Sequence, residues 1–224
     1  MVRLSQDAQR LARAVAVLAP EDARLAEALA ELDPEQAAWA ADTLAAEHVV
    51  SPDRPLRFVH PLVRSAVAET MPPGERDLLH ARAAELLRAE GAPPERVAGH
   101  WLLAAPGNRS GAVAELREAA RLASERGAPD AALRYLRRAL AEPPSRDERG
   151  ELPGELGAVE LRLALEVGER HLRQALAAAS SARRRAELAR ELRLPLFAMG
   201  RHAEAAELFR DARERLGDST ASSR

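Results

Sequence analysis

The sequence predicts a mainly α-helical fold, and its composition together with an internal repeat of about 36 residues leads to that prediction. Hydrophobic residues make up 46% of the 224 residues and aromatic residues only 3%, so alanine and leucine supply most of the apolar surface. Such a composition is typical of helices that pack closely through small side chains. A chain of this length can form one large domain or two small ones.

The first 45 residues or so have the features of three short helices. Apolar residues follow helical spacing from Leu4 to Leu18, and Ser5 or Asp7 can bond to the free amides at the start of that helix. Pro20 opens a second helix, and a third follows Asp33 and Pro34, a cap residue with a proline in the first turn. These three helices predict a compact bundle.

The hydrophobic period then changes from helical to strand-like. Residues 49–50 and 56–59 predict two short strands joined by the turn SPDRP. Pro61 suits the first turn of a fourth helix, and MPPG at 71–74 ends it. Three helices, a hairpin and a further helix are the order of a winged-helix domain, which we expect to span residues 1–72.

The remainder of the chain repeats itself. Residues 83–93, AAELLRAEGAP, match residues 119–129, AARLASERGAP, including the glycines Gly91 and Gly127. A second landmark recurs as YLRRAL at 135, HLRQAL at 171 and LFRDAR at 208, and the segment from Gly200 is in register with the segment from Gly127. Helix pairs with a glycine corner at this period resemble tetratricopeptide-type repeats.

Each helix pair would expose an apolar stripe that only the next pair can cover. Glycine allows the positive φ of the corner, and small side chains let the helices approach closely. We expect tetratricopeptide-like repeats over residues 73–217 and a polar tail at 218–224. The repeat is weakest at 143–166, where prolines and glycines gather and we expect one helix of the array to be displaced or short. The alanines expected at close helix contacts are Ala83, Ala119, Ala131, Ala139, Ala175, Ala205 and Ala212.

Charge and composition exclude several functions. The formal net charge is −2, and the third predicted helix contains Trp39 but no arginine, so we expect no direct DNA binding by this chain. The chain has no cysteine and no lysine, which removes thiolate chemistry and the lysine of a P-loop. Without a signal peptide or a long apolar run, we expect a cytoplasmic protein with no membrane contact.

Three stretches in order, RPLRFVHPLVRSAVAE, ERDLLHARAAELL and GAPDAALRYLRRALAEPP, resemble the middle of LuxR-type, MalT-like transcriptional regulators, which belong to the STAND ATPases. The resemblance covers residues 8–216. It implies a winged-helix domain and helical repeats that lie, in the family, between a P-loop ATPase domain and a DNA-binding helix-turn-helix. This chain looks like a fragment that lacks both, so ATP or ADP would be bound only in full-length relatives and not by this chain.

The resemblance also implies a role for His60, in FVHPLVR at 58–64. In the wider class, the histidine between wing and helix senses the nucleotide by contacting the β-phosphate of ADP. Pro61 stands here where many relatives have an aspartate. Without an ATPase domain, the alternative is that His60 caps the following helix or bonds to a neighbouring backbone group.

Other candidate sites are less specific. Trp101, Tyr135 and Arg138 are possible contacts on the surface of the repeats. His80 and His100 are expected to be packed and hydrogen-bonded, since no carboxylate or cysteine stands at metal-ligand spacing, and we predict no metal site. The basic run at 180–193 is interleaved with glutamates, which favours a solvated helix face over a nucleic-acid contact.

These observations lead to the expectation of a non-enzymatic regulatory module. It would relay the binding of a protein, peptide or small inducer on the repeats to a nucleotide-binding domain absent from this chain. A free-standing tetratricopeptide-type interaction scaffold is the alternative. An enzyme is disfavoured because no nucleophile, metal cluster or glycine-rich phosphate loop is present.

Overall fold

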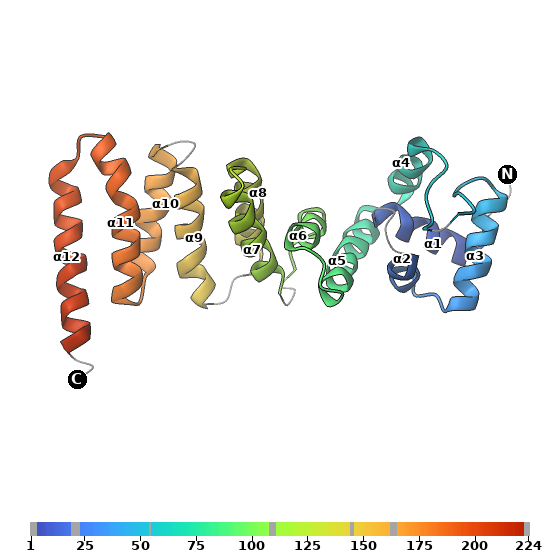
Figure 1. Ribbon diagram of the computed structural model, residues 1–224, viewed down its shortest axis with the longest axis horizontal. Helices are drawn as coiled ribbons and strands as arrows, with labels where there is room; N and C mark the ends of the chain where they lie inside the picture. Colours follow the sequence, from blue (N-terminus) through green and yellow to red (C-terminus); the bar gives the residue numbers. More distant parts are fainter. Residues whose placement is uncertain are drawn as a thin grey trace. The chain divides into compact units, whose positions relative to one another are not determined.

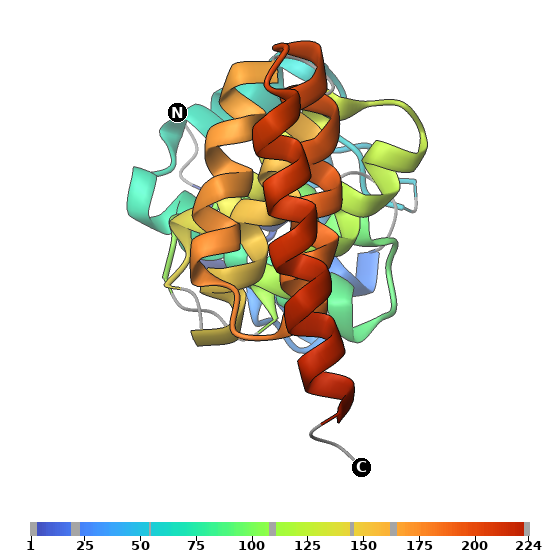
Figure 2. The ribbon, with the colours of Figure 1, turned by 90° about the vertical axis from the view of Figure 1, so that its left-hand side faces the viewer.

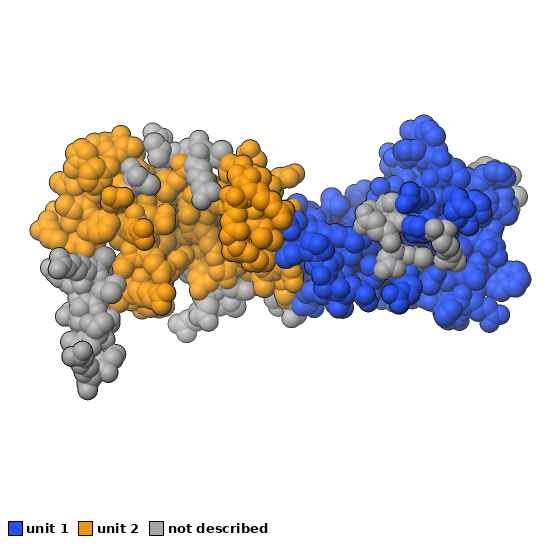
Figure 3. Space-filling model, viewed as in Figure 1, with its two compact units in different colours: residues 1–105 blue, residues 106–224 orange. Residues whose placement is uncertain are grey.

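The computed structural model describes residues 4–18, 23–53, 55–107, 111–143, 146–161 and 165–221. These residues form twelve α-helices and no β-strand, so the prediction of a mainly α-helical chain is confirmed. The chain divides into two compact units, residues 1–105 and residues 106–224, which Figure 3 shows in different colours.

Six helices lie in each unit. The helices of the first unit are α1 (Gln6–Val17), α2 (Ala23–Ala30), α3 (Pro34–Ala46), α4 (Pro61–Thr70), α5 (Pro73–Ala89) and α6 (Pro94–Leu103). The helices of the second unit are α7 (Ala112–Glu125), α8 (Pro129–Ala141), α9 (Arg146–Glu160), α10 (Leu165–Ala178), α11 (Ala182–Ala198) and α12 (His202–Ala221).

The predicted helix starts at the amino terminus are confirmed where the structure describes them. The Ser5 hydroxyl accepts a hydrogen bond from the amide of Ala8 at 3.2 Å, which caps α1. Asp33 and Gln36 form a capping box at the start of α3. Pro20, expected to open the second helix, lies outside the described residues.

The two strands expected at 49–50 and 56–59 are not formed as strands in the described residues. Only an isolated antiparallel bridge joins Val50 to Phe58. The amide of Ser51 donates to Arg57 at 2.7 Å, and the amide of Val59 donates to Val49 at 3.2 Å. Prolines at both ends of the turn SPDRP supply no amide hydrogen, so the ladder cannot grow from this turn.

Helix α5 packs with the amino-terminal helices in the first unit. Arg13 of α1 binds Glu75 at 2.6 Å, and Arg82 binds Glu31, which follows α2. Both pairs are partly exposed, so they orient α5 more than they stabilise the unit. The domain limits expected after residues 72 and 217 stay a prediction.

The second unit consists of three helical hairpins, α7–α8, α9–α10 and α11–α12, which follow one another along the chain (Figure 1). The corners that precede α8 and α12 contain Gly127 and Gly200, with φ of 74° and 71°, and Gly91 after α5 has 70°. These left-handed conformations favour glycine, as the repeat predicts. Seen along the array, α11 and α12 run antiparallel (Figure 2).

The small residues lie where helices meet. Five of the seven alanines expected at close contacts are buried, Ala131 is partly exposed, and the side chain of Ala212 lies outside those described. The buried five are Ala83, Ala119, Ala139, Ala175 and Ala205. Leucines 172, 188, 192 and 196 fill the core between α10, α11 and α12.

Helix α9 runs through most of the segment 143–166, where the prolines and glycines led us to expect a displaced or short helix. Its glycines permit close crossings. A Cβ on Gly157 would lie 2.8 Å from Cγ of Leu172 and 3.0 Å from the carbonyl of Gly168 on α10. A Cβ on Gly154 would meet Leu188 of α11 at 2.9 Å. Helix α12 likewise extends to Ala221, into the tail predicted from residue 218.

We expect Gly157→Ala to destabilise the second unit by about 1–3 kcal/mol, because the methyl group collides with backbone atoms that cannot move separately. Gly99→Ala is the matched control. Gly99 lies inside α6 with nothing within 4 Å of the added Cβ, so this change should be neutral or stabilise by up to about 1 kcal/mol. Chemical denaturation followed by circular dichroism measures both, and equal effects would contradict the close crossing.

Candidate functional site: a groove on the second unit

The second unit has a groove of about 610 Å³ between α7 and α9, with α8 contributing to its floor. Its apolar lining includes Ala120, Leu136 and Val159. Partly exposed polar residues stand along both sides, with Arg117, Glu118, Arg121, Ser124 and Glu125 on α7 and Glu155 on α9. The volume lies within the range of about 300–1,000 Å³ that is typical of ligand sites.

An ion-pair cluster crosses the groove. Arg117 of α7 binds Glu151 at 2.6 Å and donates from Nε to Glu155 at 3.0 Å, and both glutamates are on α9. The hydrogen bond that Arg117 donates to Glu155 is the main cause of a raised pKa at Arg117, so the guanidinium stays charged. Arg117 is therefore occupied by its two carboxylates and fixes α9 to α7.

Arg121 forms a second cluster on α7 alone. Its Nε donates to Glu118 at 2.9 Å, and its Nη1 also binds Glu125. Three of these carboxylates, Glu118, Glu125 and Glu155, line the groove together with the two guanidiniums, so its local charge is negative. A neutral or cationic ligand with an apolar side suits this surface best.

Two residues expected on the repeat surface are buried instead. The side chain of Trp101 is fully buried on α6, so it packs inside the chain and offers no ring to a partner. The side chain of Arg138 is only 9% exposed, and it binds the buried carboxylate of Glu142 at 2.8 Å. Glu142 also accepts from the amide of Gly107 at 2.9 Å, so Arg138 has a structural role. The sequence pattern of a helix does not show which of its polar or aromatic side chains a neighbouring helix covers, so the burial of these two residues could not be predicted.

Tyr135 is partly exposed on α8 and does not line the groove. The structure therefore brings none of the three predicted contact residues together at the groove. The ion-pair cluster of Arg117 at the groove has one signal in the sequence. Glu151 and Glu155 are four residues apart on α9, where both can face one arginine of the preceding hairpin.

His60 is exposed and caps α4. Its Nδ1 accepts a hydrogen bond from the amide of Leu62 at 3.1 Å, and the ring stands at the N-cap position before Pro61. This is the capping role that the sequence left open as the alternative. The geometry leaves Nε2 as the tautomeric donor, since Nδ1 is the acceptor.

The helix that follows His60 has no buried residue. Leu62 is 72% exposed, and Val59 just before the helix is 51% exposed. A cavity of about 260 Å³ lies beside α4 and is lined by α1 and by residues 56–58. Arg64 crosses it to donate from Nε to the carbonyl of Ala16 at 3.1 Å. An apolar helix face with so little cover is a candidate docking surface.

His80 and His100 are packed and hydrogen-bonded, as expected. Their Nδ1 atoms lie 3.1 Å apart, so one ring donates and the other accepts. Burial lowers the pKa of His100 to about 4, with smaller contributions from His80 and Arg96. Burial also lowers the pKa of His80, so both rings are neutral at pH 7. Within the described residues, no group of three or more potential metal ligands is present.

The basic run at 180–193 is solvated at its start. Glu187 binds Arg183 at 3.2 Å and Arg184 at 3.1 Å, which matches the expected face of ion pairs. Arg190 and Arg193 lie differently, in a second groove between α11 and α12.

Comparison with models of protein families, with curated proteins and with solved structures yields no significant match. The function is therefore argued from the geometry. Of the helices in the described part of the chain, none has the length and apolar character that crossing a membrane requires.

We expect the free energy of unfolding to fall as the pH falls from about 6.5 to about 4, partly because of His100. The unfolded chain binds a proton in this interval that the buried ring does not, so stability is lost until the folded pKa is passed. His100→Gln keeps a hydrogen-bonding group and removes the titration. Denaturation at several pH values should give a smaller pH slope for this variant than for wild type.

His48→Asn is the control for this measurement. His48 is exposed with a φ of 56°, a conformation that asparagine tolerates. Its replacement should leave the slope between pH 6.5 and pH 4 close to that of wild type. An unchanged slope in His100→Gln would show that the buried pair does not contribute.

Proposed function

We propose that the chain is a non-enzymatic regulatory module that binds a ligand on its second unit and relays this binding to a nucleotide-binding domain absent from this chain. The groove between α7 and α9 is the observation that carries the proposal. Its apolar floor and its acidic sides suit a cationic, partly apolar ligand, such as a basic peptide segment or a small cationic inducer.

The helical hairpins support a tetratricopeptide-like reading of the second unit. Glycine corners with positive φ recur at the intervals that the sequence repeat predicts. Arrays of this kind bind ligands on the surface formed by successive first helices of the hairpins. In the second unit, α7 and α9 are the first helices of consecutive hairpins, and the groove lies between them.

A winged-helix reading of the first unit is part of the proposal. Three helices precede the bridge between Val50 and Phe58, and α4 follows it. In this interpretation, the bridge between Val50 and Phe58 occupies the position of the β-hairpin of a winged-helix domain. The acidic α3, which projects Trp39 with 70% exposure, would then serve protein contacts and not DNA binding.

The exposed face of α4 is the surface that we assign to the relay. Leu62 and Val59 would be covered by the nucleotide-binding domain, and His60 would reach the ADP phosphate through Nε2, its free ring nitrogen. This part rests on the resemblance to the LuxR-type STAND regulators. The exposure of α4 supports it, since the unit leaves that helix uncovered.

A free-standing interaction scaffold is the second candidate. It is favoured by the position of the groove, which lies wholly within the second unit and needs no other domain to be complete. The two candidates differ in one requirement, namely whether binding on the second unit changes the nucleotide affinity of another domain.

Ligand binding in the groove can be tested by selecting peptides from a random library on the immobilised chain. We expect enrichment of peptides that combine arginine or lysine with apolar residues. Ala114→Trp places an indole in the groove from an exposed position on α7 and should abolish their binding. Ala177→Trp, on an exposed position of α10 outside the groove, is the matched control. Equal retention by both variants would place binding elsewhere.

The relay can be tested with a polypeptide that joins this chain to a nucleotide-binding domain encoded upstream. We expect His60→Ala and His60→Asn both to weaken ADP binding in calorimetry by more than about tenfold, or about 1.4 kcal/mol. Asparagine restores the helix cap but not the imidazole, so it separates the two roles. A loss in His60→Ala alone would mean that His60 only caps α4. No loss, or no such upstream domain, would favour the scaffold.

A further inference from the structure

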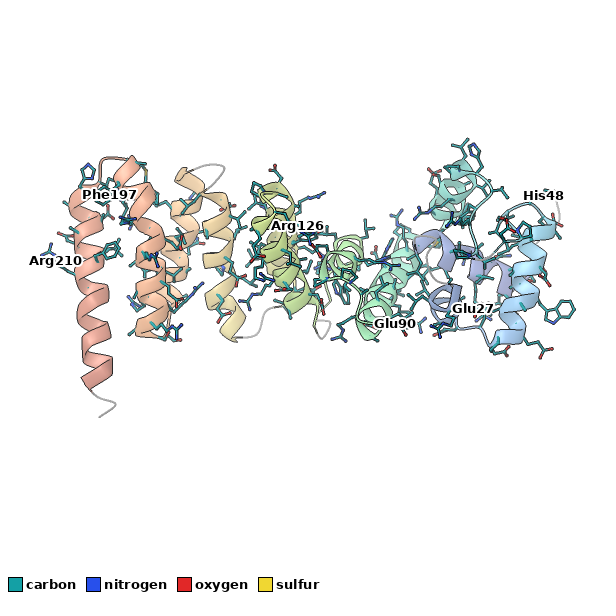
Figure 4. All side chains as sticks on the ribbon, in the orientation of Figure 1. Glu27, His48, Glu90, Arg126, Phe197 and Arg210 are labelled. Atoms are coloured by element: carbon teal, nitrogen blue, oxygen red, sulfur yellow. The ribbon has the colours of Figure 1, made fainter. Side chains whose placement is uncertain are left out.

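A second groove, of about 470 Å³, lies between α11 and α12. Its apolar lining consists of two alanines of α12 and two phenylalanines, with Phe197 51% exposed and Phe209 39% exposed. Arg190, Arg193 and His202 also line it, and none of its described lining residues is a carboxylate. The groove between α7 and α9 is acidic, whereas this one combines aromatic rings with basic side chains. Figure 4 labels Phe197 on α11 and Arg210 on α12.

The internal repeat relates this groove to the hairpin α7–α8. A shift of 73 residues places Gly127 on Gly200, α7 on α11 and α8 on α12. The buried faces agree in this register, since Ala119 and Leu192 are both fully buried. Four equivalent positions line both grooves, namely Arg117 and Arg190, Ala120 and Arg193, Ser124 and Phe197, and Leu136 and Phe209.

In the hairpin α7–α8, these positions face another helix. Helix α9 packs on α8, and its Glu151 and Glu155 reach Arg117. Arg137 of α8 reaches Glu160 of α9 at 3.4 Å. Three carboxylates of one helix, at relative positions 0, 4 and 9, therefore meet two arginines of the preceding hairpin.

The same two arginine positions recur in the hairpin α11–α12. Arg190 is equivalent to Arg117, and Arg210 is equivalent to Arg137. Both are exposed, and neither forms an ion pair with a described side chain. Within the described residues, α12 packs against α11 and no helix takes the place that α9 occupies on α7–α8.

We propose that the α11–α12 groove binds an acidic α-helix of a partner protein, seated as α9 is seated on α7–α8. The helix would carry carboxylates near relative positions 0 and 4 for Arg190 and near position 9 for Arg210. Apolar side chains between them would cover Phe197 and Phe209. The proposal is independent of the ligand of the α7–α9 groove.

The chemistry of the groove selects this partner over others. Two guanidiniums at a protein surface bind carboxylates through paired hydrogen bonds, and apolar contact with the phenylalanines adds affinity that a free anion lacks. Arg193 stands where α7 has the buried Ala120, which adds a third positive charge to the surface. A basic helix would be repelled here, although the acidic α7–α9 groove would accept one.

The chain supplies its own probe for this test. A fluorescent peptide of residues 146–161, with Pro153→Ala and Gly154→Ala to raise helix propensity, carries the three carboxylates in the native spacing. Fluorescence anisotropy measures its binding to the full chain. A second peptide, with the glutamates at 151, 155 and 160 replaced by glutamine, is the matched control and should bind about tenfold more weakly or not at all.

Substitutions in the chain locate the binding site. The double variant Arg190→Gln and Arg210→Gln should weaken the acidic peptide about tenfold, because it removes both partners of the carboxylates. Arg183→Gln is the control, since Arg183 is 90% exposed on α11 outside the groove. Circular dichroism of each variant checks that the helices are retained.

Three results would overturn the proposal. The first is the absence of binding by the acidic peptide, and the second is equal binding by the glutamine peptide. The third is loss of binding in Arg117→Gln but not in the double variant, which would mean that the peptide replaces α9 on α7–α8. Self-association of the chain that the double variant abolishes, measured by sedimentation, would assign the groove to a second copy instead.

Discussion

The second unit depends on the close approach of helices through side chains no larger than alanine. Gly157 and Gly168 allow α9 and α10 to cross at a distance that no Cβ at these positions would permit. Because dispersion forces fall steeply with separation, close crossings let many weak contacts add up without large aromatic residues. This explains how a chain with only 3% aromatic residues forms a packed array.

Arginine supplies the directional contacts that this packing lacks. Alanine faces can slide past one another, whereas a guanidinium held by two carboxylates fixes one helix to the next. Arg117 does this between α7 and α9, and Arg173 of α10 binds Glu169 of its own helix and Glu204 of α12. The partly exposed ion pairs add little stability, but they set which helix faces which. The buried pair of Arg138 and Glu142 lies at the end of α8 alone, and Glu142 ties that end to the amide of Gly107.

The local features of the fold could be predicted from the sequence, and the site could not. Caps such as Ser5 and Asp33 and corners such as Gly127 follow from short-range preferences, so their positions were predicted correctly. Helix α9 was expected to be displaced or short because its prolines and glycines are read as breakers unless the facing helices are known. Trp101 and Arg138 were placed on the surface because burial by a neighbouring helix leaves no local signal. The carboxylate spacing on α9 had meaning only once Arg117 was seen opposite it.

The antiparallel pair α11–α12 has consequences for how the array unfolds. Among the described helices, α12 packs mainly against α11 and touches α10 through the ion pair of Glu204 with Arg173, whereas α9 packs extensively against both α8 and α10. In a linear array, the free energy of each hairpin depends on the number of its neighbours, so α12 would open locally before the rest. A partner helix bound beside α12 would supply the packing that a following hairpin would give. It would therefore slow the amide hydrogen exchange of α12. Binding in this groove would thereby raise the free energy of local opening of the hairpin α11–α12, without any change in the structure of the hairpin.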